Sequence, residues 1–181
     1  RDRTVVKQKW DVIHSCLLDK AIPYAGLHNV INLNGVLKVE KNSERSLFKF
    51  MCRIVSGQQL STKAAQKIWS RLENLCKINN KKLSELCEDN NFETIRSSGL
   101  SKNKTKAMIM LNQSFKKKEI TTLKLQKLEE QEFKQFISGL WGFGPWSAEM
   151  ILLGYFGSLD IWSSNDSALK KGIDIALGEH S

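Results

Sequence analysis

Apolar residues recur along most of the chain at the spacing of one helix face. Between residues 47 and 55 they fall at i, i+1, i+3, i+4, i+7 and i+8, the stripe of a helix that faces a core. Further stripes of this kind lie at residues 6–17, 64–72, 108–115 and 133–140. Ser61 or Thr62 and Ser101 precede two of them and are suited to cap a helix N-terminus. The pattern predicts an all-α fold.

Residues 31–39, INLNGVLKV, form the one segment that looks extended. Their Asn34-Gly35 pair is of the kind that closes a two-residue hairpin, so we expect either a small hairpin or a structured loop. The chain has no repeat and no low-complexity linker. Residues 1–181 are therefore expected to form one domain, and this length also allows two small lobes with a shared core.

The stretch LWGFGPWSA, residues 140–148, holds one of the chain's two prolines. Proline costs little at the first position of a helix because its missing N–H would be unpaired there. We therefore expect a helix that begins at Pro145 and is capped by Gly144. Its buried face is expected to comprise Ala148, Ile151, Leu152 and Tyr155.

Gly142 and Gly144 form the expected turn between this helix and one that ends near Gly139 or Leu140, and positive φ is accessible to both glycines. Such a turn is most often an ordinary connection in an αα-hairpin. Glycines also leave the backbone N–H groups of a helix N-terminus uncovered, which is a ready anion site. The sequence has no Lys or Arg from residue 140 to residue 168, so a phosphate bound here would be held by backbone amides.

The formal charge of +9 suggests an anionic partner such as nucleic acid, although many soluble proteins are basic. No unbroken apolar run approaches the roughly 20 residues that a membrane span needs, so no membrane partner is expected. The first residues are charged rather than signal-like, and we expect an intracellular protein, in a bacterial cytoplasm or a eukaryotic nucleus. The cysteines have no CxxC spacing and are expected to be buried, reduced thiols: Cys16, Cys52, Cys76 and Cys87.

The stretch LWGFGPWSAEMILL, followed by LDIWSSND, resembles the helix-hairpin-helix and downstream aspartate of the helix-hairpin-helix DNA glycosylases. Within that superfamily it is most similar to the 3-methyladenine DNA glycosylase II group, which excises alkylated bases. Three further stretches agree in order: FMCRIVSGQQLSTKAAQKIWSRL, SSGLSKNKTKAMIML and the helix that ends FISGL. The resemblance covers most of residues 47–172.

The resemblance implies a two-lobed helical glycosylase fold with an active-site cleft between the lobes. One lobe would comprise roughly residues 45–125, and the other roughly residues 1–44 with 126–181, including the helix-hairpin-helix at 129–157. The β-rich N-terminal domain of larger bacterial members has no counterpart in this sequence.

The family's catalytic aspartate corresponds to Asp166. Cleavage of an N-glycosidic bond builds oxocarbenium character on the deoxyribose, and a nearby carboxylate can stabilise that charge and orient or deprotonate the attacking water. The alternative is that Asp166 only caps the last helix, as aspartates commonly do. Asp160 is the rival carboxylate, and the resemblance gives it a structural role.

Glycosylases flip the target nucleotide out of the duplex and fill the gap that it leaves. The resemblance places the filling residue at Gln59 with Leu60 beside it, and Gln58 and Ser61 at the minor groove. The alternatives are that a glutamine pairs with backbone at a helix–helix turn and that Ser61 only caps the following helix.

The base pocket implied by the resemblance is aromatic and includes Trp146 and Met150, which share one helix face. Trp146 stands where the base-cleaving lyases of the superfamily carry a nucleophilic lysine, which favours a monofunctional, water-using enzyme. Core packing is the alternative for Trp146. Trp141 and Trp162 are expected to pack in the core or on the surface.

Backbone amides of the hairpin would bind DNA phosphate, and the residues concerned are Gly142, Phe143, Gly144, Trp146 and Ser147. The family also holds a monovalent cation, Na⁺ or K⁺, on hairpin carbonyls, which here would be those of Ser138, Leu140 and Phe143. The basic residues Lys102, Lys104 and Lys106 would line or steer DNA. No cofactor is otherwise required, and no four-cysteine cluster follows Asp166 to hold an iron–sulfur centre.

Together these features predict a monomeric, monofunctional DNA glycosylase that hydrolytically excises alkylated bases such as 3-methyladenine from double-stranded DNA and so initiates base excision repair. The alternatives are a non-catalytic helix-hairpin-helix DNA-binding module and a glycosylase for deaminated or oxidised bases. An aspartate at the family spacing counts against the module, and Trp146 in place of lysine counts against an oxidised-base lyase.

Overall fold

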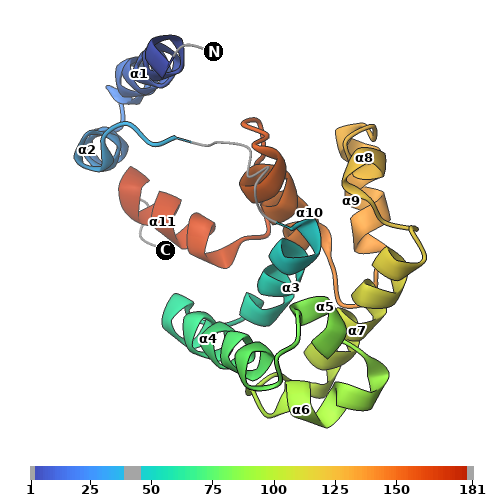
Figure 1. Cartoon of the computed structure of the whole chain (residues 1–181). Helices are drawn as coiled ribbons and strands as arrows, with labels where there is room; N and C mark the ends of the chain where they lie inside the picture. Colours follow the sequence, from blue (N-terminus) through green and yellow to red (C-terminus); the bar gives the residue numbers. More distant parts are fainter. Residues whose placement is uncertain (1–2, 39–45, 179–181) are drawn as a thin grey trace. The chain divides into compact units, whose positions relative to one another are not determined.

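The computed structural model describes residues 3–38 and 46–178, with side chains from Lys9 onward. All regular structure in these residues is helical (Figure 1), so the predicted all-α fold is confirmed. The chain divides into two compact units: Arg1–Glu40 with Trp162–Ser181, and Lys41–Ile161. This grouping keeps residues 126–161 with residues 45–125, whereas the predicted lobes separated them.

The first unit contains α1 (Arg3–Ala21), α2 (Ala25–Asn34) and α11 (Ser167–Leu177). Helix α2 contacts both α1 and α11. Gly26 lets α2 and α11 approach closely, because a β-carbon at this position would lie 2.1 Å from the carbonyl oxygen of Ala176. Trp10 of the predicted N-terminal stripe is buried, but Leu17 is exposed. The stripe therefore extends beyond the part of α1 that its neighbours cover.

The prediction of an extended segment at residues 31–39 is wrong for its first part, because α2 continues through Asn34. Gly35 then ends the helix with φ of 63°, and its N–H donates to the carbonyl oxygens of Ile31 and Asn32. An Asn-Gly pair fits a helix C-terminus as well as a hairpin, because glycine readily adopts the left-handed conformation that both require. Residues 36–38 are neither helix nor strand, and residue 39 lies outside the described part of the chain.

The second unit contains α3 (Leu47–Gly57), α4 (Thr62–Ile78), α5 (Leu83–Leu86), α6 (Phe92–Arg96), α7 (Lys102–Lys116), α8 (Thr122–Leu125), α9 (Glu130–Ser138) and α10 (Pro145–Ile151), with a 3₁₀ turn at Asp89–Asn91 and a π-helical turn at Leu152–Phe156. Two of the predicted N-caps are confirmed. The Ser61 hydroxyl accepts a hydrogen bond from the Ala64 amide, and the Ser101 hydroxyl accepts one from the Lys104 amide.

Helix α3 is the central element of the second unit and contacts α4, α7 and α10. Four residues of its predicted apolar stripe are buried (Leu47, Phe48, Met51 and Val55), and the other two, Phe50 and Ile54, are partly buried. Met51 and Val55, with Cys52 beside them, have no exposed surface. The facing helices contribute Leu72, Met108 and Ile151, which are equally buried. Because buried residues lie along the length of α3, its packing fixes both ends of the helix relative to α4, α7 and α10.

The cysteines are all free thiols, but their burial differs from the prediction. Cys52 and Cys87 are buried and Cys76 is partly buried, whereas Cys16 on α1 is exposed. Burial and the neighbouring Cys87 thiol raise the pKa of Cys52, which keeps it protonated. The buried thiols therefore behave as small apolar core residues.

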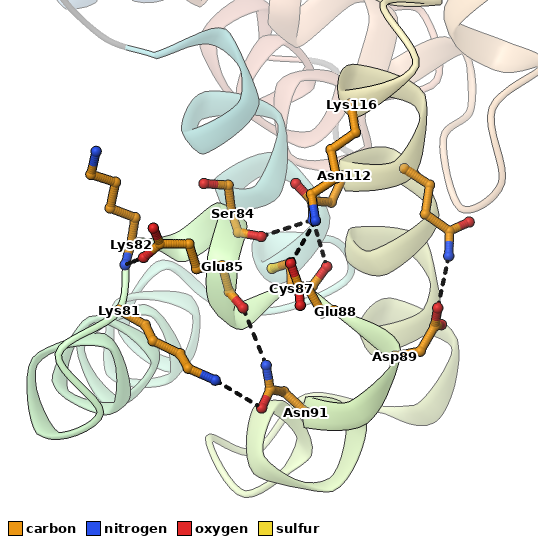
Figure 2. Close-up of polar contacts among 11 residues, drawn as sticks. Lys81, Lys82, Ser84, Glu85, Cys87, Glu88, Asp89, Asn91, Asn112 and Lys116 are labelled. Atoms are coloured by element: carbon orange, nitrogen blue, oxygen red, sulfur yellow. Dashed lines mark hydrogen bonds and ion pairs between the residues drawn. The ribbon is translucent and has the colours of Figure 1, made fainter.

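A buried amide ties α7 to the short helix α5, as Figure 2 shows. Asn112 is 2% exposed, and its side-chain N–H₂ donates to the carbonyl oxygens of Ser84 and Cys87, each at 2.8 Å. A helix end leaves carbonyls without donors, and this amide supplies them for α5. The neighbouring Gln113 makes a more exposed hydrogen bond to Asp89 at 3.0 Å.

We predict that Asn112→Leu lowers the free energy of unfolding by about 1–3 kcal/mol, because two carbonyls then lose their donor in a buried place. Denaturant unfolding followed by circular dichroism measures this change. Gln113→Leu, one residue along the same helix, is the control and should stay within about 0.5 kcal/mol. Equal losses for the two variants would show that the buried amide has no special contribution.

Candidate active site

The predicted helix-hairpin-helix is present in the second unit. Helix α9 ends at Ser138, and the Phe143 amide donates to the Leu140 carbonyl at 3.0 Å to close the turn. Gly144 is the N-cap of α10 and Pro145 is its first residue, as predicted. The predicted inner face of α10, formed by Ala148, Ile151, Leu152 and Tyr155, is buried.

The two turn glycines differ in backbone conformation, and only Gly142 has the positive φ that was predicted for both. Gly142 has φ of 81°, and a β-carbon there would lie 2.5 Å from that of Ala107 on α7. Gly144 instead has φ of −129° and ψ of −176°, an extended conformation open to any residue. A β-carbon at Gly144 would meet no atom within 4 Å. Gly142 therefore sets the turn, while Gly144 leaves open space at the start of α10.

The turn between α3 and α4 presents Gln59 and Leu60 to solvent, and Leu60 is 40% exposed. Gln59 has φ of 55°, a left-handed conformation that a non-glycine residue adopts only when its surroundings enforce it. Ser61, which follows, caps α4. The structure thus brings the predicted wedge residues to the tip of an exposed turn, and their contact with DNA stays a prediction.

Gln58 points inward and joins this turn to the hairpin. Its side-chain N–H₂ donates to the carbonyl oxygen of Gly142 and to the hydroxyl oxygen of Ser147, each at 2.9 Å. Of the two interpretations for the glutamine pair, backbone pairing thus describes Gln58, while Gln59 is exposed. Sequence reasoning missed this contact, because residues 58 and 142 are far apart along the chain.

The three predicted DNA-steering lysines of α7 have different environments. The Lys104 ammonium donates to the main-chain carbonyls of Ser56, at 3.1 Å, and Gln58, at 2.6 Å. Burial lowers the pKa of Lys104 from its ordinary value. Lys102 is exposed, and Lys106, also exposed, lies 4.2 Å from the ring centre of Trp141. Lys104 therefore differs from the prediction, since two of its three N–H donors are directed at the protein itself.

The aromatic side chains near the hairpin divide into surface and partly buried groups. Trp141 and Trp162 are 49% and 63% exposed, so both lie at the surface, one of the two packing positions expected for them. Trp146 and Met150 are partly buried and lie four residues apart on α10, hence on one face of it. Their role as a base pocket stays a prediction.

A π-helical turn at Leu152–Phe156 continues α10 and was not foreseen from the sequence. Gly154 lies within it, and a β-carbon there would come 2.8 Å from the ring of Phe50 on α3. Tyr155 packs on the same ring, with ring centres 5.6 Å apart. Such turns are frequent at functional sites. This one lets the chain that continues α10 pack closely against α3.

Asp166 lies in the first unit, as the N-cap of α11. One of its carboxylate oxygens accepts hydrogen bonds from the amides of Ala168 and Leu169, both at 2.9 Å. The capping interpretation is therefore correct as a description of this structure. It is compatible with catalysis, because a carboxylate has two oxygens and about four acceptor positions.

No group of three or more His, Cys, Asp and Glu residues suited to hold a metal ion occurs among the described residues. The predicted cation ligands are instead main-chain carbonyls, hard oxygen donors of the kind that alkali cations take. The Leu140 carbonyl already accepts from Phe143, and a carbonyl oxygen has a second lone pair. In the described part of the chain, no helix is long and apolar enough to cross a membrane.

Solved structures share this fold. A DNA-3-methyladenine glycosidase from Bacillus halodurans matches with a TM-score of 0.67 and 24% identity, over 91% of this chain and 74% of that one. A Schizosaccharomyces pombe 3-methyladenine DNA glycosylase, Mag1, solved in complex with abasic DNA, matches with a TM-score of 0.76 and 20% identity, over 86% and 77%. The chain therefore shares the fold of these two 3-methyladenine DNA glycosylases.

Curated relatives of similar sequence agree with the fold. DNA-3-methyladenine glycosylase 1 of Schizosaccharomyces pombe is 23% identical over 173 residues, 92% of this chain and 75% of the relative. The alkylbase DNA glycosidase-like protein mag2 of the same yeast is 25% identical over 138 residues, 75% of this chain and 65% of the relative. Comparison with protein-family models finds no match. The chain is thus similar in sequence to a DNA-3-methyladenine glycosylase and to an alkylbase DNA glycosidase-like protein.

We predict that Gly142→Ala lowers the free energy of unfolding by about 1–3 kcal/mol, because a β-carbon is disfavoured at positive φ and meets Ala107. Gly144→Ala is the matched control and should change it by less than about 0.5 kcal/mol. Both values come from denaturant unfolding. A fully stable Gly142→Ala variant would mean that the turn and α7 are not held as the structure shows.

Proposed function

We propose that this chain is a monofunctional DNA glycosylase that excises alkylated bases, such as 3-methyladenine, from duplex DNA by hydrolysis. The observation that carries the proposal is that the Gln58 side chain hydrogen-bonds the turn that presents Gln59 to the helix-hairpin-helix. One compact unit thereby offers a residue that can enter the duplex and a helix N-terminus that can hold a phosphate. The relatives, a DNA-3-methyladenine glycosylase and an alkylbase DNA glycosidase-like protein, support the same reaction.

Duplex DNA binds, in this proposal, through the backbone at the start of α10. Gly144 provides open space there, and the extended backbone leads directly into Pro145. A phosphate oxygen would accept hydrogen bonds from backbone amides among Gly142, Gly144, Trp146 and Ser147. The Phe143 amide, predicted to join them, already donates to the Leu140 carbonyl. The exposed Lys102 and Lys106 and the formal charge of +9 add a longer-range attraction to the duplex.

Base flipping precedes the chemistry. Gln59 fills the gap in the stack, Leu60 wedges beside it, and Trp146 and Met150 stack on the extruded base. An alkylated purine can carry positive charge, which favours an electron-rich indole ring. Because Trp146 is not an amine, it cannot form a Schiff base, and the enzyme therefore uses water without lyase activity.

Asp166 provides the charge for hydrolysis. The bond between the base and C1′ of the deoxyribose breaks with its electron pair going to the base, and the sugar becomes an oxocarbenium ion that the carboxylate stabilises. Water then bonds to C1′ and loses a proton, for which the carboxylate is the acceptor. The products are the free base and an abasic site in the duplex.

The proposal includes a monovalent cation bound to the hairpin in a structural role. The carbonyls of Ser138, Leu140 and Phe143 would hold Na⁺ or K⁺ and so tie the turn to a DNA phosphate. The enzyme is further proposed to act as a monomer. A non-catalytic binding module and a glycosylase for deaminated or oxidised bases are not favoured by the relatives.

We predict that Asp166→Asn slows excision of 3-methyladenine from a duplex by about two to three decades, because one electrostatic contribution to the transition state is lost. Asparagine keeps a side-chain oxygen for the amides of Ala168 and Leu169 and is itself a good N-cap, so folding should be nearly unchanged. Single-turnover excision and thermal unfolding measure the two effects. Asp160→Asn serves as the charge-matched control, and parent-like excision by Asp166→Asn would leave this residue as a cap only.

We predict that Gln59→Ala weakens excision from duplex DNA, because nothing then occupies the gap left by the flipped base. Unstacking costs on the order of a few kcal/mol, least at mispaired bases, so the loss should be largest for a well-paired lesion. Rates on paired, mispaired and single-stranded substrates test this order. Gln66→Ala, on the exposed side of α4, is the control, and an equal loss of activity on all three substrates would contradict a filling role.

A further inference from the structure

Two polar side chains beside the exposed turn direct their donors at the protein. Lys104 donates to the carbonyls of Ser56 and Gln58, at the C-terminal end of α3. Gln58 donates to Gly142 and Ser147, at the turn and first turn of α10. The result is a continuous chain of hydrogen bonds from α7 through the α3 end to the hairpin, here called the Lys104–Gln58 clamp.

The clamp lies directly beside the one strained position of the turn. Gln59 has positive φ, and both Gln59 and Leu60 are exposed, so neighbouring side chains give this conformation little packing. Gln58, the residue immediately before it, is held through two groups. Its main-chain carbonyl accepts a hydrogen bond from Lys104, and its side-chain amide donates one to the hairpin. With Gln58 fixed, the backbone leaves it in a single direction, and Gln59 follows in the conformation that the structure shows.

Electrostatics favour Lys104 at this place. The last carbonyls of a helix carry partial negative charge and lack intrahelical donors, and a cation there satisfies them. Lys104 is partly buried, while its neighbours Lys102 and Lys106 on the same helix are exposed. Its position therefore suits an internal contact better than a contact with DNA.

We propose that Gln58 and Lys104 are positioning residues, which fix the duplex-filling Gln59 relative to the phosphate-binding hairpin. The inference rests on the proposed function, which supplies the roles of Gln59 and of the hairpin. Both parts must meet the same nucleotide region of the duplex, so a fixed spacing between them removes an ordering step from binding. Small misplacements of such groups are costly in rate.

The experiment combines substitution at Lys104 with substitution at Gln59. Lys104→Met keeps the length of the side chain and removes its donors and charge. Base flipping is followed by the fluorescence of 2-aminopurine placed next to the lesion, and excision by single-turnover rates on a 3-methyladenine duplex. We expect Lys104→Met to reduce both the fluorescence rise and the duplex rate, the latter by about 10- to 100-fold.

The decisive comparison is the double variant. If Lys104 acts through Gln59, the combined change should lower the duplex rate no more than Gln59→Ala does alone. Losses that multiply would overturn the inference. Lys104→Arg, which keeps the charge and donors, should restore most of the rate, and Gln58→Met should reproduce the loss. These two variants give the answer if Lys104→Met is too unstable to measure.

Salt dependence separates positioning from a direct phosphate contact. Lys102→Met, the matched control on the exposed side of α7, should flatten the dependence of duplex affinity on salt by about 0.9 log units per decade. Lys104→Met should leave that slope unchanged, and an equal flattening would overturn the inference. Fluorescence and affinity need no excision, so a parent chain that binds and flips without excising would refute the proposed chemistry and still test the clamp.

Discussion

Complete burial of one face of α3 is the constraint on which the second unit depends. Met51, Cys52 and Val55 have no exposed surface, and the helix that carries them contacts α4, α7 and α10. Interiors packed at this density do not let a helix slide or rotate without opening a cavity. The C-terminal end of α3 is therefore fixed relative to α4, α7 and α10, and this also fixes where the exposed turn begins.

The C-terminal end of α3 and the N-terminal end of α10 differ in how their backbone polar groups are satisfied. The carbonyl end of α3 receives donors from within the protein, two of them from Lys104. The amide end of α10 begins at Gly144, where a side chain would have open space around it. One helix end is thus satisfied internally, and the other has open space at Gly144, which is where the proposed phosphate contact would lie.

The N-cap role that the structure gives Asp166 bears on the catalytic role proposed for it. Its carboxylate caps α11 through two amides, which fixes the rotamer and the position of the charge. A catalytic carboxylate needs the same fixed position, because electrostatic stabilisation depends on preorganised charge. Capping is therefore a support for the proposed chemistry rather than a competitor of it.

The sequence by itself determined the helical class, the caps and the hairpin, because these follow from local rules. Apolar spacing located α3, α4, α7 and α9, Ser61 and Ser101 marked two N-termini, and Pro145 marked the start of α10. The ordered motifs also carried the resemblance to the glycosylases. Local rules were ambiguous at Asn34-Gly35, where one pair fits a helix end and a hairpin equally, and the packing of α2 against α1 and α11 favoured the helix.

Only the tertiary structure decided which polar residues face inward. Gln58 and Gln59 are identical neighbours in the sequence, yet one bonds the hairpin and the other is exposed. Lys102, Lys104 and Lys106 look alike, yet one of them satisfies the end of α3. Gly142 and Gly144 both read as flexible, yet only Gly142 needs positive φ and close contact with Ala107. The physical reason is that each partner comes from a distant part of the chain, so its presence is set by packing and not by local sequence.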